Sequence, residues 1–344
     1  MTLQALLGLE LPIIQAPMAG VQGSELAIAV SESGALGSLP CGMLTADALR
    51  SEMARIHSRT ARPVNVNFFC HALPIPDPAR EQAWRELLAP YYQEYGIEYG
   101  TGGASRVPFN LEMAAVLEEF APAVVSFHFG LPEPALLARV KRWGAKVLGC
   151  ATTVEEARWL EAYGADAIIA QGAEAGGHRG MFLTEDISTQ TGTLALVRQV
   201  VQSVSLPVIG AGGIADAEGV RAVMALGAAG VQVGTAYLLC PEATTGAVHR
   251  AALQAEGAGH TALTNLFSGR PARGIVNRLM RELGPINGQV PPFPLASAGL
   301  ARLRAQAEST GSGDFSPLWA GQNTRGCRQI PAAELTRQLA AGLD

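Results

Sequence analysis

The sequence predicts an α/β fold, specifically a (β/α)8 barrel, and three observations lead to it. The 344 residues are 48% hydrophobic and 16% charged, a composition typical of a globular protein with a large core. Eight short apolar runs recur along the chain, as expected for parallel strands covered on both faces. Longer segments with helical signals lie between the runs, and eight such β-α units can close into a barrel. An open doubly wound sheet is the alternative.

The apolar runs give the expected strands in chain order. They are residues 13–18, 35–40, 63–69, 123–130, 146–151, 168–173, 207–213 and 230–238. A helix is expected after Thr153, because Glu156 follows three residues later as in a capping box and Gly164 follows the last turn. Thr45 and Asp216 are the expected N-caps of two further helices.

Two stretches interrupt the alternation of strands and helices. Residues 70–122 are longer than one helix requires, and residues 239–306 are too long for a helix that merely closes the barrel. We therefore expect a barrel formed by residues 1–238 and 307–344, with residues 239–306 as a smaller, mostly helical domain that caps its mouth. The Gly-rich segment 309–323 is expected to be a loop that returns to the barrel.

Charge and cysteine content argue against several classes of protein. The net charge of −5 and the lack of a basic run argue against a nucleic-acid partner. The five cysteines are scattered without a CxxC motif, so neither a disulfide framework nor a metal site is expected. No signal-peptide pattern and no apolar run of about 18 residues occur, so we expect a cytoplasmic protein that does not span a membrane. We also expect a monomer or a homodimer.

Small and polar residues gather where the expected strands end, which is the edge that carries the chemistry in barrels. The strands end in APMAG, NFF, HFG, QGAEAGGHRG, GAGGIAD and VGTAYL. A shared ligand would explain this common location. The last two segments resemble the phosphate site that barrels often place after strands seven and eight, where bare N–H groups face an anion.

The segment GAGGIA at residues 210–215 also matches the dinucleotide fingerprint G-x-G-x-x-A. That fingerprint requires an acidic residue roughly 20 positions later to hold a ribose. The sequence around position 230 is AAGVQVGT, which has no acidic residue. A mononucleotide phosphate is therefore favoured over NAD.

The segment QGAEAGGHRG surrounds His178 with four glycines. Glycine lets the backbone approach a ligand closely, and a histidine there can act as a base or bind an anion near neutral pH. His178 is therefore the candidate catalytic residue, whereas His128 in SFHFG either lines the site or packs in the core. Glu174 and Arg179 are expected to form structural ion pairs, and Cys150 is expected to be a core thiol.

Eight motifs in the same order resemble the nitronate monooxygenase family and cover nearly the whole chain. They are PIIQAPMAG, NVNFF, VVSFHFGLP, AQGAEAGGHRG, PVIGAGGIADAEG, GVQVGTAYLLCPEA, FSGRPARG and GSGDFSPLWAGQ. The resemblance implies an FMN-binding TIM barrel with a smaller inserted domain. It also implies oxidation of alkyl nitronates, such as propionate 3-nitronate, with O₂ to carbonyl compounds plus nitrite or nitrate.

The resemblance further implies roles for residues at matching positions. His178 matches the active-site histidine beside the flavin, and His128 is the candidate substrate-binding residue. His178 would remove the α-proton of a neutral nitroalkane, whereas a nitronate has already lost that proton and would only be oriented. The implied FMN contacts are Asn67, Gln171, Gly176, Gly213, Gln232, Val233, Gly234 and Thr235, with no metal.

One segment departs from the family pattern. The family places tyrosines near the substrate after the eighth strand, but no tyrosine follows Tyr237 here, and Phe293 can supply an aromatic wall without a hydroxyl. Substrate range is the property that this difference affects. Two other functions fit the same motifs, an NADH-dependent FMN reductase of quinones or enoyl thioesters and a non-redox barrel that binds a phosphate.

Overall fold

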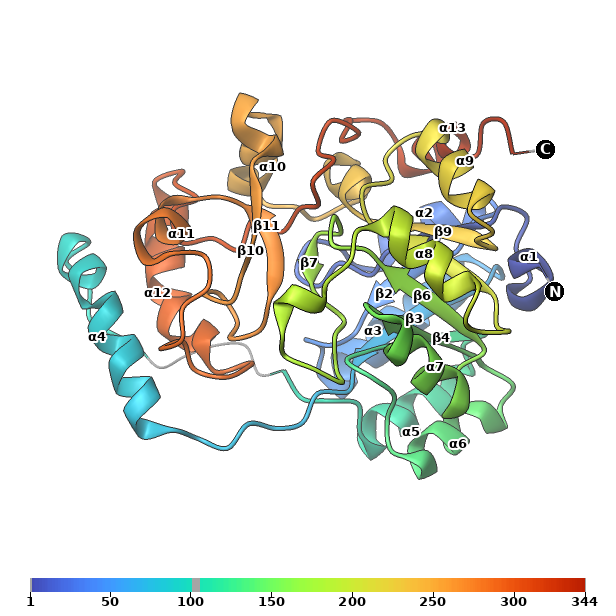
Figure 1. Cartoon of the computed structure of the whole chain (residues 1–344), viewed down its shortest axis with the longest axis horizontal. Coiled ribbons are helices and arrows are strands. Elements are labelled where there is room, and N and C mark those ends of the chain that lie inside the picture. The colour runs from blue at the N-terminus through green and yellow to red at the C-terminus, as the bar shows by residue number, and fades with distance from the viewer. Residues whose placement is uncertain (1, 101–105, 344) are drawn as a thin grey trace.

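The computed structural model describes residues 2–100 and 106–343 (Figure 1). Its main sheet has eight strands in the order β1-β9-β8-β6-β5-β4-β3-β2, and every pairing within it is parallel. The strands are β1 (Ile13–Gln15), β2 (Gly37–Pro40), β3 (Val64–Phe69), β4 (Val124–His128), β5 (Lys146–Ala151), β6 (Ala167–Gln171), β8 (Val208–Ala211) and β9 (Gly230–Val233).

The two ends of this strand order also meet. Ile14 of β1 forms a parallel bridge with Leu36, directly before β2, and the N–H of Leu36 donates to the carbonyl oxygen of Ile13 at 2.9 Å. The sheet therefore closes into a barrel, which confirms the predicted (β/α)8 fold and shows that the open doubly wound alternative is wrong. Each of the eight apolar runs contains one strand of the barrel.

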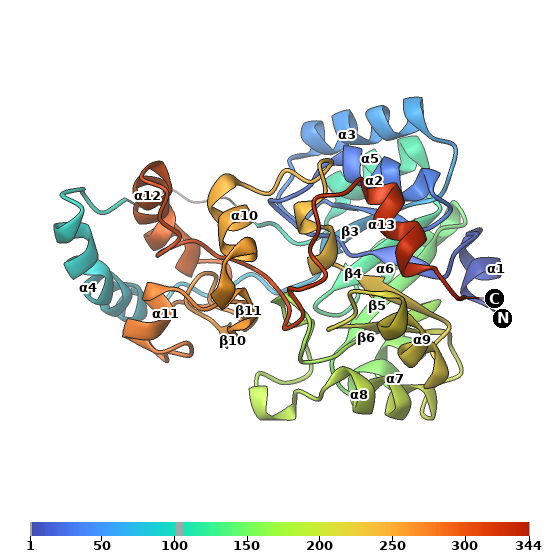
Figure 2. The same ribbon diagram turned by 90° about the horizontal axis from the view of Figure 1, so that it is seen from above.

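Helices surround the barrel, as Figure 2 shows from above. They are α1 (Leu3–Leu7), α2 (Ser24–Glu32), α3 (Ala46–Arg59), α5 (Leu111–Phe120), α6 (Pro134–Arg142), α7 (Val154–Ala162), α8 (Thr193–Val201), α9 (Ala217–Ala225) and α13 (Ala332–Leu339). Leu3 and Leu7 of α1 pack with inward-facing strand residues such as Leu148 and Ile209. This cluster fills the amino-terminal end of the barrel, so the carboxyl ends of the strands form the open mouth.

The predicted N-caps form, although one capping box is incomplete. Thr45 Oγ1 accepts from the N–H of Ala48, the third residue of α3. Asp216 Oδ1 accepts from the N–H of Gly219, the third residue of α9. Thr153 Oγ1 accepts from the N–H of Glu156 at 3.2 Å, but the Glu156 carboxylate accepts from the N–H and hydroxyl of Thr152, at 2.7 and 2.8 Å. The carboxylate is fully buried and also accepts from the N–H of Phe182 at 2.6 Å, so it joins α7 to a neighbouring loop.

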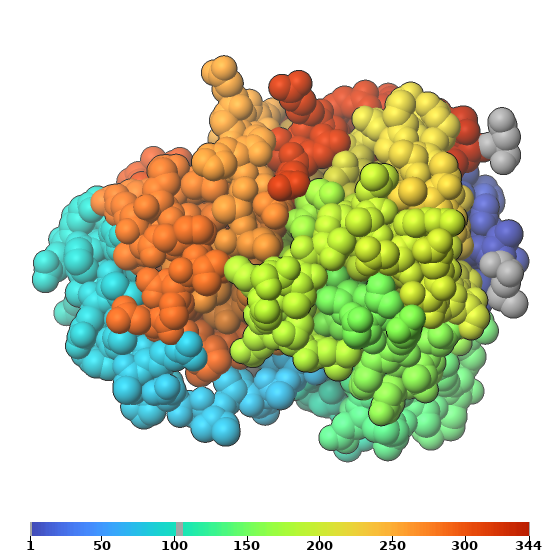
Figure 3. Space-filling model, viewed as in Figure 1, coloured from blue at the N-terminus to red at the C-terminus, as the bar shows by residue number. Residues whose placement is uncertain are grey.

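A second group of elements, which we call the cap lobe, lies beside the barrel mouth (Figures 1 and 2). It consists of α4 (Pro78–Glu94), α10 (Ala247–Gln254), β10 (Thr261–Thr264), β11 (Ala272–Ile275), α11 (Arg278–Leu283) and α12 (Ala296–Ser309). Strands β10 and β11 are antiparallel, and β11 also pairs with β7 (Gly177–His178). Figure 3 shows the resulting contact, with the orange part of the cap lobe directly against the yellow-green segment that follows β7.

Helix α4 belongs to this lobe although it lies between β3 and β4 in the sequence. Trp84 and Leu88 of α4 share an apolar cluster with Leu300 and Leu303 of α12, and Trp84 Nε1 donates to the carbonyl oxygen of Ala296 at 3.2 Å. The domain boundaries expected at residues 238 and 307 stay a prediction. The packing of α4 explains why the interval between β3 and β4 is so long.

Two further observations concern membrane-spanning helices and the cysteines. Within the described ranges, no helix has the length and apolar character needed to cross a membrane. All five cysteines are free, and burial raises the pKa of the Cys150 thiol to about 12. Cys150 packs in an apolar cluster as predicted, and it also lines the cavity at the barrel mouth.

Candidate active site

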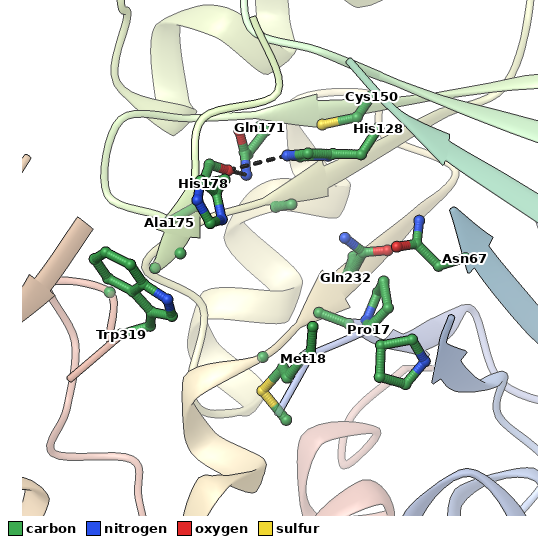
Figure 4. Close-up of a pocket in the computed structure, with 18 of the residues that line it drawn as sticks. Pro17, Met18, Asn67, His128, Cys150, Gln171, Ala175, His178, Gln232 and Trp319 are labelled. Carbon is green, nitrogen blue, oxygen red and sulfur yellow. Dashed lines mark hydrogen bonds between the residues drawn. The ribbon is translucent and has the colours of Figure 1, made fainter. Parts of the chain in front are cut away.

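A cavity opens at the carboxyl ends of the barrel strands, and residues from most of the expected loops line it (Figure 4). In Figure 4, Pro17 and Met18 from the loop after β1 lie on the opposite side of this cavity from His178. The predicted site residues that line it are Asn67, His128, Gln171, Gly176, His178, Gly213, Gln232, Gly234 and Thr235. Val233 instead packs in the barrel core, while its carbonyl oxygen accepts from the N–H of Ala16 at 2.8 Å.

His178 is held at both its side chain and its backbone. It pairs with Ala272 of β11, and its Nε2 lies 2.8 Å from the hydroxyl oxygen of Ser268. That hydroxyl is also 3.2 Å from the carbonyl oxygen of Arg270, which can only accept. When Ser268 donates to this carbonyl, Nε2 of His178 carries the hydrogen and Nδ1 keeps a free lone pair.

His128 and Gln171 support the backbone of His178 (Figure 4). His128 Nε2 and Gln171 Nε2 lie 3.1 and 3.0 Å from the carbonyl oxygen of His178, and Gln171 Oε1 accepts from the N–H of Gly180 at 2.8 Å. Burial lowers the pKa of His128 to about 4, so its imidazole is neutral at pH 7. The two residues thereby fix the position of the loop that carries the catalytic candidate.

Arg179 lies on the other side of this loop and has no exposed surface. Its guanidinium donates to the carbonyl oxygens of Gln171 and Gly172, at 2.6 and 2.7 Å, and to Gln190 Oε1 at 2.7 Å. The Glu174 carboxylate accepts from the N–H and hydroxyl of Thr193, both at 2.7 Å. The predicted ion pairs are therefore wrong, because these side chains bind backbone and hydroxyl groups instead.

Aromatic side chains enclose the imidazole of His178. Its ring centroid lies 5.4 Å from that of Phe293, 5.5 Å from Trp319, 6.1 Å from Phe129 and 6.3 Å from Phe69. Such surroundings exclude water and destabilise the charged form of an ionisable group relative to its neutral form.

Cations near His178 lower its pKa, as burial does. Burial, followed by the charge of Arg106 and the neighbouring His128, holds the pKa of His178 well below 6.5. Among the described residues that line the cavity, none is Asp or Glu. The site therefore combines a neutral histidine with a positive potential, an arrangement that suits an anionic ligand.

The far end of the cavity is built from bare backbone. Gly212 and Gly213 have φ values of 120° and 73°, in the region that favours glycine, and they precede the N-cap of α9. The chain after Trp319 returns to this end as predicted, since Gly321 N–H donates to Thr235 Oγ1 at 2.9 Å and Asn323 Nδ2 donates to the carbonyl oxygen of Gly213 at 3.0 Å.

Comparison with known proteins decides the family. The family model described as nitronate monooxygenase matches residues 1–342. The chain belongs to the nitronate monooxygenase family. A nitronate monooxygenase of Pseudomonas aeruginosa is 45% identical over 97% of this chain and 96% of its own length. One of Paraburkholderia phytofirmans is 42% identical over 97% and 92%.

A solved structure supports the same assignment. The nitroalkane oxidase from Streptomyces ansochromogenes superimposes with a TM-score of 0.90 at 41% identity, covering 99% of this chain and 97% of that one. The chain is thus a member of an oxidoreductase family, and its closed barrel with a cap lobe is the fold of its relatives.

The cavity fits the flavin that the family resemblance implies. Gln232 Oε1 is buried and has no hydrogen-bond partner among the described residues, and in Figure 4 it points toward the side-chain oxygen of Asn67. A flavin ring has both N–H and carbonyl groups, so it can supply a partner for the buried Gln232 amide. A Cβ at Gly176 would lie 2.5 Å from the backbone nitrogen of Gly321, so the cavity wall there requires glycine.

Sequence reasoning missed several residues around His178. Ser268 and Trp319 reach it from segments about 90 and 140 positions later in the chain, through the β7–β11 pairing and the returning tail. The FSGR and SPLW motifs that contain them were visible, but nothing local assigns them to the site. Within residues 2–100 and 106–343, no group of three or more His, Cys, Asp or Glu side chains is placed to hold a metal ion.

Proposed function

We propose that this chain is an FMN-dependent nitronate monooxygenase that oxidises alkyl nitronates, such as propionate 3-nitronate, with O₂ to carbonyl compounds plus nitrite or nitrate. The observation that carries the proposal is a neutral His178 in an aromatic cavity that has a positive potential and no acidic residue among its described lining. A nitronate is an anion with an apolar chain, and such a cavity matches both properties.

The residues that would hold FMN divide between the two ends of the cavity. Asn67, Gln171 and Gln232 would bind the polar edge of the ring, and Gln232 Oε1 would gain the partner that it lacks. Gly213 and Thr235 would bind the phosphate with backbone N–H groups and a hydroxyl. Bound FMN supplies the redox chemistry, as the acceptor of electrons that O₂ finally takes.

His178 would act differently on the two forms of a nitro compound. Toward a neutral nitroalkane, the free Nδ1 lone pair can take the α-proton, and the low pKa of His178 keeps that lone pair available at neutral pH. Toward a nitronate, which has no such proton to lose, His178 would bind and orient the anion. Ser268 would position the imidazole for both tasks through Nε2.

The aromatic wall would protect the reacting carbon from water. Phe69, Phe129 and Phe293 form one buried cluster whose exposed fractions are 8, 4 and 6%, and Trp319 closes the side nearest the returning tail. A dry site strengthens each electrostatic contact with the bound anion.

A direct assay tests the proposal. The purified chain is loaded with FMN, and oxygen uptake and nitrite formation are measured with propionate 3-nitronate. We expect nitronate-dependent uptake with nitrite that requires bound FMN. A flavin-loaded protein that consumes no oxygen with any short alkyl nitronate, but is turned over by NADH and a quinone or enoyl thioester, would instead support the reductase alternative.

A further inference from the structure

The cavity contains one permanent positive charge that the proposed chemistry at His178 does not use. Among the described residues that line it, Arg106 is the one Lys or Arg, and none is Asp or Glu. The neighbouring residues 101–105 have the sequence TGGAS, which also contains no acidic side chain. The Arg106 side chain is half-buried, and a partly desolvated charge without a carboxylate partner among the described residues is stabilised by an anionic ligand.

The contacts of Arg106 with the described residues use one of its side-chain donors. Nη1 donates to Ser297 Oγ of α12 at 3.2 Å, and the hydroxyl of Ser297 in turn donates to the carbonyl oxygen of Pro294 at 2.9 Å. A guanidinium has five N–H donors in a planar fork, and this is the side-chain bond that the described residues make with it. The fork matches the two oxygens of a carboxylate.

Arg106 is held in place rather than free to move. His71 Nε2 lies 3.1 Å from the carbonyl oxygen of Arg106, and the His71 ring packs edge-on to Phe293 with centroids 4.8 Å apart. Ser297 fixes the guanidinium from the opposite side, within the cap lobe. An anchored guanidinium loses little additional freedom when it binds an anion.

Phe293 connects this cation with His178. The guanidinium carbon lies 5.8 Å from the centroid of Phe293, and the same ring is 5.4 Å from the centroid of His178. Burial and, after it, the charge of Arg106 lower the pKa of His178. His178 and Arg106 both line the cavity, so a short molecule that reacts beside His178 would direct its other end toward Arg106.

Arg270, the other nearby arginine, makes its contacts outside the cavity, and its Nε is buried without a hydrogen-bond partner among the described residues. Its guanidinium carbon lies 4.1 Å over the ring of Phe129, and it donates to the carbonyl oxygen of Met181. It is not among the residues that line the cavity. Arg106 is thus the cation that a ligand in the cavity can reach.

We propose that Arg106, positioned by Ser297, is the residue that binds the carboxylate of a nitronate such as propionate 3-nitronate while the reacting carbon lies beside His178. The proposal rests on the proposed nitronate oxidation, and it names the residue that selects the substrate.

The test compares two nitronates of equal chain length with FMN-loaded wild type, Arg106→Met and Arg106→Lys. For propionate 3-nitronate, Arg106→Met should lower kcat/KM about 30-fold or more, mainly through KM, since a charge-assisted pair is lost. For propyl-1-nitronate, which lacks the carboxylate, the loss should be under about 3-fold. Arg106→Lys should recover part of the loss, because it keeps the charge without the fork. Equal losses on both nitronates, or none, would overturn the proposal.

A control and a binding measurement separate this proposal from the proposed function. Arg302→Met removes an exposed charge from α12, where Arg302 contacts the carbonyl oxygen of Glu98, and should leave the ratio of the two substrates unchanged. Calorimetry with 3-nitropropanoate measures carboxylate binding without turnover, and Arg106→Met should weaken it about 10-fold or more. If wild type oxidises neither nitronate, the proposed function fails, while this difference in binding still supports the subsite. Equal binding by both proteins, or no binding by wild type, would refute it.

Discussion

Replacing Arg179 with methionine tests whether a buried cation holds the catalytic loop in place. Arg179 donates to the carbonyl oxygens of Gln171 and Gly172 and to the side chain of Gln190, all at 2.7 Å or less. Gln171 and Gly172 lie at the start of the loop that carries His178, and Gln190 lies after it. Methionine has a similar volume but cannot donate, so all three acceptors lose a charged partner.

The size of the effect follows from these three bonds. A buried acceptor left without its partner costs about 1–3 kcal/mol, and methionine recovers part of this because it removes the desolvation of a charge. We expect a net loss of about 3 kcal/mol or more in the free energy of unfolding, against a total of roughly 5–15 kcal/mol for a typical protein. Because the same bonds position the loop, FMN retention and activity should fall as well.

Chemical denaturation at constant flavin concentration measures the free energy, and gel filtration followed by absorbance measures retained FMN. Arg198→Met is the matched control, since Arg198 is exposed and also donates to a backbone carbonyl, that of Leu226, at 3.2 Å. It should change stability by less than about 0.5 kcal/mol. A loss below about 1 kcal/mol in Arg179→Met, with normal FMN retention, would refute the role assigned to Arg179.

Three further predictions address the site. His178→Asn should lower kcat/KM about 10²–10⁴-fold on neutral nitroalkanes and far less on nitronates, whereas equal losses would argue against a base. Gly213→Leu should weaken FMN binding at least about 10-fold because φ is 73° there, while Gly246→Ala, in open space, should not; full retention in the first variant would exclude the phosphate cradle. The folded-state pKa of His128 is about 4 against 6.5 unfolded, so the unfolded chain binds more protons between these values and stability should fall as pH drops from 6.5 to 4, by up to about 3 kcal/mol from this residue. His128→Gln should flatten that decline. If the variant and the wild type lose the same stability between pH 6.5 and 4, burial of His128 is not the cause of the decline.

Local sequence signals predicted the barrel and its catalytic edge well. Continuous apolar runs predicted all eight strands, because a parallel strand that is covered on both faces is apolar along its whole length. His178 could be selected since the glycines around it have no purpose in a strand or helix. His178, Asn67 and Gln232 all line the cavity. This could be predicted because the carboxyl ends of all barrel strands lie at the same edge of the barrel.

Contacts between distant segments could not be predicted in the same way. Helix α4 joins the cap lobe through Trp84 and Ala296, which are more than 200 positions apart, and no local pattern records that pairing. Ser268 reaches His178 through the pairing of β11 with β7, a strand of two residues that is too short to show a periodicity. Arg179 and Glu174 were paired on charge alone, but carbonyl oxygens and hydroxyl groups lay closer to each of them.

The central claim is that this cavity oxidises nitronates with a bound flavin, and one anaerobic experiment tests it most directly. The visible spectrum of the FMN-loaded protein is recorded after mixing with propionate 3-nitronate and, separately, with NADH. If the chain oxidises nitronates, the flavin spectrum should change rapidly with the nitronate and should not change with NADH. Complete bleaching by NADH with no response to the nitronate would contradict it and would assign the chain to the reductase alternative.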